Sequence, residues 1–115
     1  MKKIKYSPNS ITKLQNIKKE IIDQFGQETA RRVIKKITMS IRNLQQYENT
    51  GQSVESITGI PCDHRVFYAQ HNYIFYRVDN DTIWITDIYN EKEDFMWSLF
   101  GIKTTTQETE EYWND

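Results

Sequence analysis

Apolar residues recur every three to four positions in two long stretches of the first half of the chain, which is the spacing of a helix with one buried face. In the first stretch they are Ile11, Leu14, Ile17, Ile21 and Phe25, and in the second Ala30, Val33, Ile34, Ile37, Ile41, Leu44 and Tyr47. Ser7 and Pro8 suit an N-cap and a first helical position, and Gly26 suits a helix end. The pattern therefore predicts two antiparallel helices with a very short connection, an αα-hairpin.

Shorter stretches carry the alternation and the residue types of β-strands. Residues 2–6 alternate lysines with Ile4 and Tyr6, which suits a strand at a sheet edge. Three further strands are predicted at residues 65–68, 73–78 and 82–89. In the last of them, strict alternation would set Ile83, Ile85 and Asp87 on one face and Trp84, Thr86 and Ile88 on the other.

The turn chemistry of residues 79–81 predicts a hairpin between the last two strands. A two-residue turn there would pair Val78 with Ile83 and Tyr76 with Ile85, giving one apolar face for the helices. The same register would bring Arg77 beside Trp84 on the opposite face, where a cation–π contact can form.

The remaining residues complete a single small domain. Residues 48–61 are polar and contain glycines and a proline, so we expect a loop. A short terminal helix is expected at residues 91–100, and an acidic, flexible tail at residues 103–115. The result is an α+β domain over residues 1–102, in the order β-α-α-β-β-β-α, with an αα-hairpin packed on one face of a small, mostly antiparallel sheet.

Composition narrows the class of protein. A chain of 115 residues suits one domain, and its single cysteine, Cys62, cannot form an internal disulfide. No Cys/His cluster has metal-ligand spacing, so neither a metal nor a cofactor is expected. The charged N-terminus lacks the apolar stretch of a secretory signal, and no segment is apolar enough to span a membrane. A cytoplasmic protein is the expectation.

The net charge of −1 conceals two opposite halves. Residues 1–50 carry 11 Lys/Arg and 4 Asp/Glu, a balance of +7, whereas residues 51–115 carry 4 and 12, a balance of −8. The basic half is compatible with an acidic protein partner or a nucleic acid, and equally with a solvated helix surface.

Several short sequence segments resemble those of the RelE/ParE superfamily of bacterial type II toxins. They are FYRV at residues 75–78, TIWITDIY at residues 82–89 and above all KEDFMWSLFG at residues 92–101, which is similar to an R-x-D-Y-x-x-x-L-F-G ending. The opening strand followed by S-P-x-S-I-x-x-L from residue 7 is also similar to the family. The resemblance covers residues 2–102 and implies a toxin neutralised by a cognate antitoxin in a hetero-oligomer. Relatives either cleave mRNA on the ribosome without a metal or inhibit DNA gyrase.

The resemblance to RNA-cleaving relatives suggests candidate catalytic residues. Cleavage requires a base for the 2′-hydroxyl, positive charge at the phosphate and an acid for the leaving oxygen. The matching region offers Arg65, Arg77 and Lys92, with His64 and Asn90 as further RNA or partner contacts. Each has a structural alternative: a pairing with Asp63 or a solvated position for Arg65, and stacking on Trp84 or a pairing with Asp79 for Arg77.

The chain also departs from the family pattern where catalysis would need it. Lys92 stands for the family's arginine and Glu93 intervenes after it, Phe95 replaces a tyrosine and so lacks a hydroxyl, and Asn90 occupies a position where histidine is frequent. These departures favour a gyrase inhibitor or an inactive toxin-derived binding module over a nuclease, whereas the prevalence of ribosome-dependent relatives favours a nuclease.

Two further groups are candidates for binding RNA or a partner. The aromatic residues most suited to exposure are Tyr73, Tyr89 and Trp97, although most aromatics at strand spacing are core residues. On the second helix the basic residues lie largely off the apolar stripe, and they are Arg31, Arg32, Lys35 and Lys36. Such a face suits an acidic antitoxin tail or a contact with gyrase.

Overall fold

The computed structural model describes residues 1–92. The predicted terminal helix beyond residue 92, the tail at residues 103–115 and Trp97 therefore lie outside the described residues.

Five strands form one mixed sheet in the order β1-β5-β4-β3-β2. Their bounds are β1 Lys3–Tyr6, β2 Gln52–Ser53, β3 Arg65–Ala69, β4 Asn72–Val78 and β5 Thr82–Asn90. β1 runs parallel to β5, and the other three pairings are antiparallel. The expected position of the N-terminal strand at a sheet edge is confirmed, as is the α+β class.

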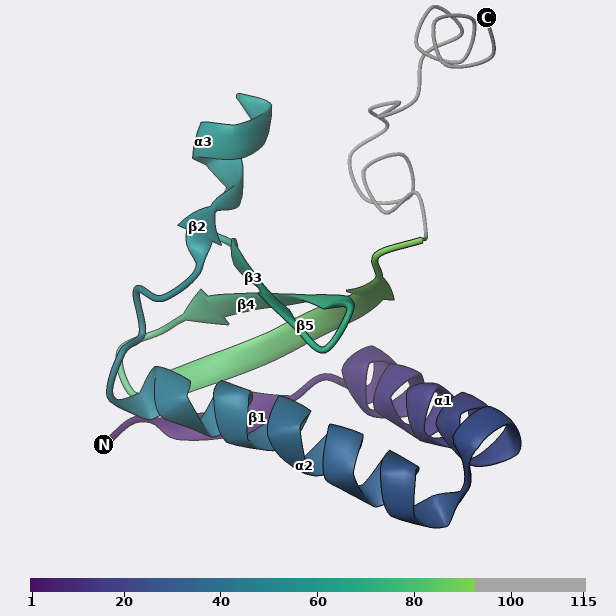
Figure 1. Cartoon of the computed structure of the whole chain (residues 1–115). Coiled ribbons are helices and arrows are strands. Elements are labelled where there is room, and N and C mark those ends of the chain that lie inside the picture. Colours follow the sequence, from purple (N-terminus) through teal and green to yellow (C-terminus); the bar gives the residue numbers. More distant parts are fainter. Residues whose placement is uncertain (93–115) are drawn as a thin grey trace, which may run out of the picture.

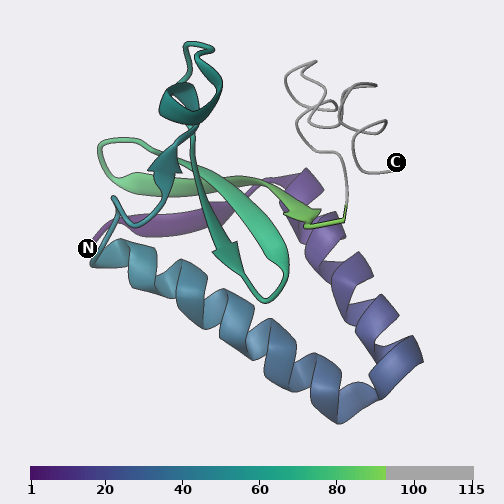
Figure 2. The ribbon, with the colours of Figure 1, turned by 45° about the horizontal axis from the view of Figure 1, so that its top comes forward.

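The two long helices form the predicted hairpin on one face of this sheet. α1 spans Pro8–Phe25 and α2 spans Gln27–Arg42. Gly26 joins them with φ 92°, a conformation that side chains disfavour. Both helices lie below the sheet in Figure 1, and they diverge from the hairpin tip toward the sheet in Figure 2.

The start of α1 protects the part of the β5 edge that β1 is too short to cover. Ser7 caps the helix by accepting a hydrogen bond from the Ser10 amide at 3.0 Å. The Ser7 amide donates to the Ile85 carbonyl at 2.9 Å and its hydroxyl to the Thr86 carbonyl at 2.9 Å. The buried Ser10 hydroxyl also donates to Ile85, at 3.1 Å. One short polar segment thus both starts the helix and satisfies acceptors of an edge that would otherwise lack partners.

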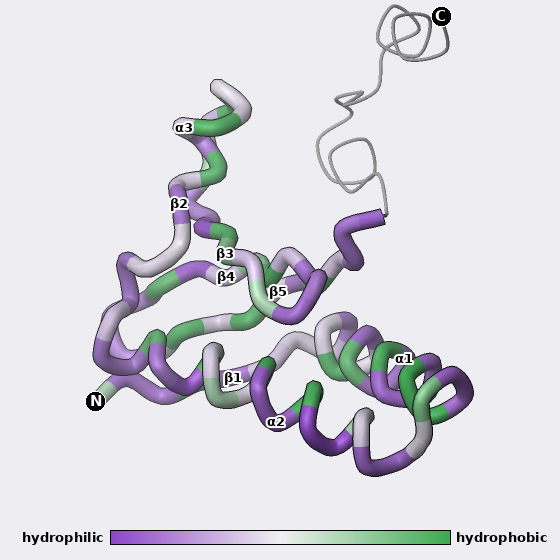
Figure 3. The backbone as a smooth tube through the Cα atoms, in the orientation of Figure 1, coloured by the Kyte–Doolittle hydropathy of each residue, from purple (hydrophilic) through white to green (hydrophobic). Residues whose placement is uncertain are grey.

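The core lies between the hairpin and the sheet. Its fully buried side chains are Ile37, Ile41, Leu44, Ile74, Tyr76, Ile83, Ile85 and Ile88. Hydrophobic positions of α2 turn toward the sheet and hydrophilic ones away from it, as Figure 3 shows. The predicted pairings of Val78 with Ile83 and of Tyr76 with Ile85 are confirmed.

A β-bulge corrects one detail of β5. Phe75 pairs with Asp87 but Tyr76 pairs with Ile85, so Thr86 is an extra residue in β5. The extra residue reverses the alternation, and Ile88 instead of Asp87 faces the helices. The prediction that Asp87 shares a face with Ile85 was wrong because a bulge leaves no mark in the hydrophobic pattern.

The expected loop at residues 48–61 is also more structured than predicted. α2 is followed by a short 3₁₀ helix, η1 Asn43–Gln45, and the region then contains β2 and the helix α3 Val54–Thr58. Ser53 caps α3 and Gly59, with φ 75°, ends it. Tyr47, assigned to the apolar stripe, is 66% exposed because α2 ends before it. No helix within residues 1–92 is long and apolar enough to cross a membrane.

Candidate functional site

The sheet face opposite the hairpin carries three of the predicted site residues, Tyr73, Arg77 and Tyr89. Residues paired across the strands share a face, and on β4 and β5 this face bears Tyr73, Phe75, Arg77, Trp84, Asp87 and Tyr89. No helix within residues 1–92 lies over it (Figure 1). We call it the helix-free face.

Arg77 lies at one end of this face and is held by its neighbours. Its guanidinium is 3.0 Å from the Asp79 carboxylate and 5.9 Å from the centre of the Trp84 ring. The Trp84 indole nitrogen donates to Asp79 at 3.2 Å, and the Lys5 ammonium lies 5.4 Å from the same ring. Both structural alternatives for Arg77 are thus confirmed, and its guanidinium is engaged by the first residue after β4.

Arg65 lies on the opposite face of the sheet, because its partner across the strands is the core residue Tyr76. Its guanidinium donates to the Gly51 carbonyl at 2.6 Å. The Tyr76 hydroxyl accepts from the Gly51 amide at 2.9 Å and donates to the Glu48 carbonyl at 2.7 Å. Burial raises the pKa of Tyr76, so its hydroxyl stays protonated as this donor.

Arg65 does not take the alternative of pairing with Asp63, because its guanidinium donates to the Gly51 carbonyl. The Asp63 carboxylate instead lies 3.1 Å from the imidazole of the next residue, His64. Arg65 anchors the segment before β2, and this contact lies on the helix side of the sheet.

Lys92 lies at the far end of the sheet from Arg77. It follows β5, whose last residue Asn90 pairs with Asn72, and its amide donates to the Asn90 side chain at 2.9 Å. Asn72 and Arg77 are five residues apart on β4, which corresponds to about 17 Å along a strand. The structure therefore does not bring Arg65, Arg77 and Lys92 together: one lies on the other face, and two lie at opposite ends.

The predicted aromatic residues of the helix-free face pack on one another. Tyr73 meets Tyr68 edge-to-face with ring centres 5.3 Å apart, and Phe75 meets Tyr89 at 6.1 Å. The Lys13 ammonium lies 3.4 Å from the centre of the Tyr89 ring and 3.1 Å from the Asp87 carboxylate. Tyr73 and Tyr89 are both partly buried.

A polar cluster that the sequence did not indicate lies beside Lys92. The Tyr68 hydroxyl donates to one oxygen of Glu91 at 2.7 Å, and the His71 imidazole lies 2.9 Å from the other. The hydrogen bond between Tyr68 and Glu91 raises the pKa of Tyr68 and lowers the pKa of the Glu91 carboxyl. Both carboxylate oxygens are engaged and the cluster is exposed, so it lacks the water-excluded donors of a preorganised catalytic centre.

The spacing of these residues explains why the cluster was missed. A two-residue turn at Gln70 and His71, both with positive φ, folds β3 onto β4 and brings Tyr68 near Glu91. The residues are 23 positions apart in the chain, and no local motif joins them.

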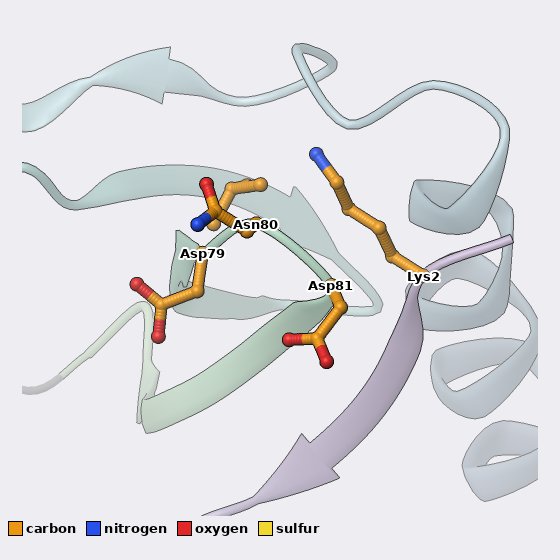
Figure 4. Close-up of a pocket in the computed structure, with 5 residues that line it drawn as sticks. Lys2, Asp79, Asn80 and Asp81 are labelled. Atoms are coloured by element: carbon orange, nitrogen blue, oxygen red, sulfur yellow. The ribbon is translucent and has the colours of Figure 1, made fainter.

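An open pocket of about 610 Å³ lies between the N-terminus and the β4–β5 turn, lined by Lys2, Val78, Asp79, Asn80 and Asp81. Figure 4 shows the Lys2 side chain and the two carboxylates pointing in different directions. Lys2 pairs with Glu48, and Asp81 accepts from the Thr82 hydroxyl at 3.1 Å. With Asp79 engaged by Arg77, the charged groups do not converge on a ligand.

The predicted basic residues of α2 lie away from the sheet. Arg31, Arg32, Lys35 and Lys36 are all exposed. They share the outward side of α2, whereas Ala30, Ile37 and Ile41 are buried. This surface is therefore separate from the helix-free face.

The fold defines a class: a small α+β domain in which an αα-hairpin covers one face of a mixed sheet, as in the RelE/ParE superfamily. A chain of the "Chromosomal ParDE TA system from P. aeruginosa" has this fold, with a TM-score of 0.66 at 22% identity over 78% of this chain and 96% of that chain. No curated protein sequence matches significantly.

The family described as "ParE toxin of type II toxin-antitoxin system, parDE" matches residues 4–95. The chain belongs to this ParE toxin family. The resemblance drawn from the sequence is thereby confirmed, and a toxin role follows from it.

Proposed function

We propose that the chain is a growth-inhibiting toxin that acts on DNA gyrase and does not cleave mRNA. Membership of the ParE family supports this direction. The observation that carries the proposal is the separation of Arg65, Arg77 and Lys92 over two faces and two ends of the sheet.

The separation matters because phosphoryl transfer needs several groups at one phosphate. A base, an acid and the stabilising charge must all lie within hydrogen-bond reach of the reacting atoms. A single missing preorganised donor can cost about 10²–10³ in rate. Two of the three cations are further engaged by Gly51 and Asp79, so they are unavailable to a substrate without breaking contacts of the fold.

An antitoxin partner is part of the same proposal, in a toxin–antitoxin hetero-oligomer in the cytoplasm. Ile11 and Phe25 are 45% and 68% exposed and lie two heptads apart on α1, hence on similar sides of the helix. An amphipathic antitoxin helix could bury them. The structural neighbour, a chain of the "Chromosomal ParDE TA system from P. aeruginosa", supports a protein partner of this type.

Two reactions with purified protein test the target. In a supercoiling assay with DNA gyrase, we expect the chain to stop supercoiling and to accumulate cleaved DNA held by the enzyme. In a translation reaction with ribosomes, we expect mRNA to stay intact. Codon-dependent mRNA cuts with normal supercoiling would instead establish the ribosome-dependent endoribonuclease, and inactivity of folded protein in both reactions would establish the binding module.

A further inference from the structure

The outward side of α2 carries five exposed cations, Arg31, Arg32, Lys35, Lys36 and Arg42. We call this set the basic ridge. The opposite side of the helix is anchored in the core by Ile37 and Ile41, so the ridge has a fixed orientation. It extends over twelve residues, 31–42, whose ends are about 16 Å apart along the helix.

The basic ridge is not neutralised within the part of the chain that the structure describes. Glu28 is the one acidic residue of α2, and none of the ion pairs among residues 1–92 involves the ridge. Arg31 and Lys35, and likewise Arg32 and Lys36, are like charges four residues apart, an arrangement that destabilises a helix slightly. A free-standing domain gains nothing from this repulsion, whereas binding a polyanion would relieve it.

We infer that the basic ridge binds the sugar-phosphate backbone of duplex DNA without reading its sequence. A ridge of about 16 Å lies beside about five phosphates of one strand, at 3.4 Å per phosphate along the axis. Backbone contacts of this kind position a protein on DNA but carry no base information. The inference does not depend on the proposed function, although a toxin directed at a DNA-bound enzyme would use such a surface.

The composition of the ridge favours duplex DNA over the alternatives. Proteins that hold single strands add aromatic platforms for the bases, and α2 contains no aromatic residue. A protein partner such as an acidic antitoxin tail would be expected to bury apolar anchors, and Met39 is the one large hydrophobic residue of α2 that is exposed, at 52%.

The distribution of charge also favours an approach of DNA from the side of the helix hairpin. The hairpin, residues 8–42, carries 8 Lys/Arg and 3 Asp/Glu, a balance of +5. On the helix-free face, by contrast, carboxylates are paired with cations, Asp87 with Lys13 and Asp79 with Arg77. A polyanion is therefore attracted to the helical layer.

Fluorescence anisotropy of the full chain with a labelled duplex of random sequence tests the inference. With about five phosphate contacts, log K should fall with log salt at a slope of about −4.5, which is on the order of 500-fold between about 50 and about 200 mM salt. The quadruple variant Arg31→Gln, Arg32→Gln, Lys35→Gln, Lys36→Gln should lose measurable binding at the higher salt, while its circular dichroism spectrum and melting temperature remain those of the parent.

A matched pair of variants separates the ridge from net charge. Arg32→Gln/Lys36→Gln and Lys3→Gln/Lys92→Gln remove the same charge, but the second pair lies on exposed positions of the sheet layer. The ridge pair should flatten the salt slope by about 2, and the sheet pair should leave it unchanged. Equal effects of the two pairs, tighter binding of a single strand, or tighter binding of poly-glutamate of equal charge would overturn the inference.

The DNA-binding result and the gyrase result can be told apart. Binding to the duplex with no effect on gyrase would contradict the proposed function and still support DNA binding by the basic ridge. Inhibition of gyrase that survives the quadruple substitution, with no duplex binding by the parent, would do the reverse.

Discussion

Individual residues of this fold are fixed by close packing around the Tyr76 hydroxyl. A Cβ on Gly51 would lie 2.8 Å from the carbonyl oxygen of Val66 and 2.8 Å from a ring carbon of Tyr76. The first of these is backbone within the sheet and cannot move aside. The sequence identified Gly51 only as a loop residue, because its requirement arises from strands that lie far along the chain.

Gly51→Ala should therefore lower the free energy of unfolding by about 2 kcal/mol, since overpacking adds to the loss of hydrogen bonds with Tyr76 and Arg65. Urea denaturation measures the change. Asn49→Ala, an exposed position in the same segment, is the control and should stay within about 0.5 kcal/mol of the parent. A Gly51→Ala protein as stable as the parent would show that the segment is not packed as described.

The elements themselves were largely predictable from the sequence. The helix hairpin and the pairing of β4 with β5 follow from periodicity and turn chemistry that act over a few residues. The bulge at Thr86 and the β2–α3 segment did not follow, because both depend on contacts with other strands. The local hydrophobic pattern thus determined which main elements form. Tertiary contacts determined which face of β5 its residues occupy after the bulge.

The β3–β4 turn makes a prediction at the scale of an element. Gln70 and His71 have φ of 50° and 65°, as in the two-residue turns that favour Asn-Gly. The left-handed conformation costs most side chains roughly 1–2 kcal/mol. A glycine avoids this cost, although its greater entropy in the unfolded chain offsets part of the gain. Gln70→Asn/His71→Gly should raise the free energy of unfolding by about 1 kcal/mol, measured by urea denaturation. A loss of stability would mean that the His71–Glu91 contact outweighs the backbone strain.

At the scale of the whole molecule, the sequence placed the candidate residues on the correct strands but could not assemble a site. Arg65, Arg77 and Lys92 read as one basic group along the chain, yet register assigns Arg65 to the helix side and separates the other two along β4 and β5. The Tyr68–His71–Glu91 cluster could not be predicted either, because it forms only when β3, β4 and β5 are paired. Which face and which end a residue occupies is a property of the complete sheet.

The central claim is that growth inhibition proceeds through gyrase without a nuclease centre on the sheet. The direct test is induced expression in a bacterial host that carries a DNA-damage reporter, with mapping of mRNA ends, for the parent chain and for Lys92→Gln. We predict that growth stops and the reporter switches on, that mRNA is intact, and that Lys92→Gln behaves like the parent. Ribosome-positioned mRNA cuts that disappear in folded Lys92→Gln, without a DNA-damage signal, would contradict the account.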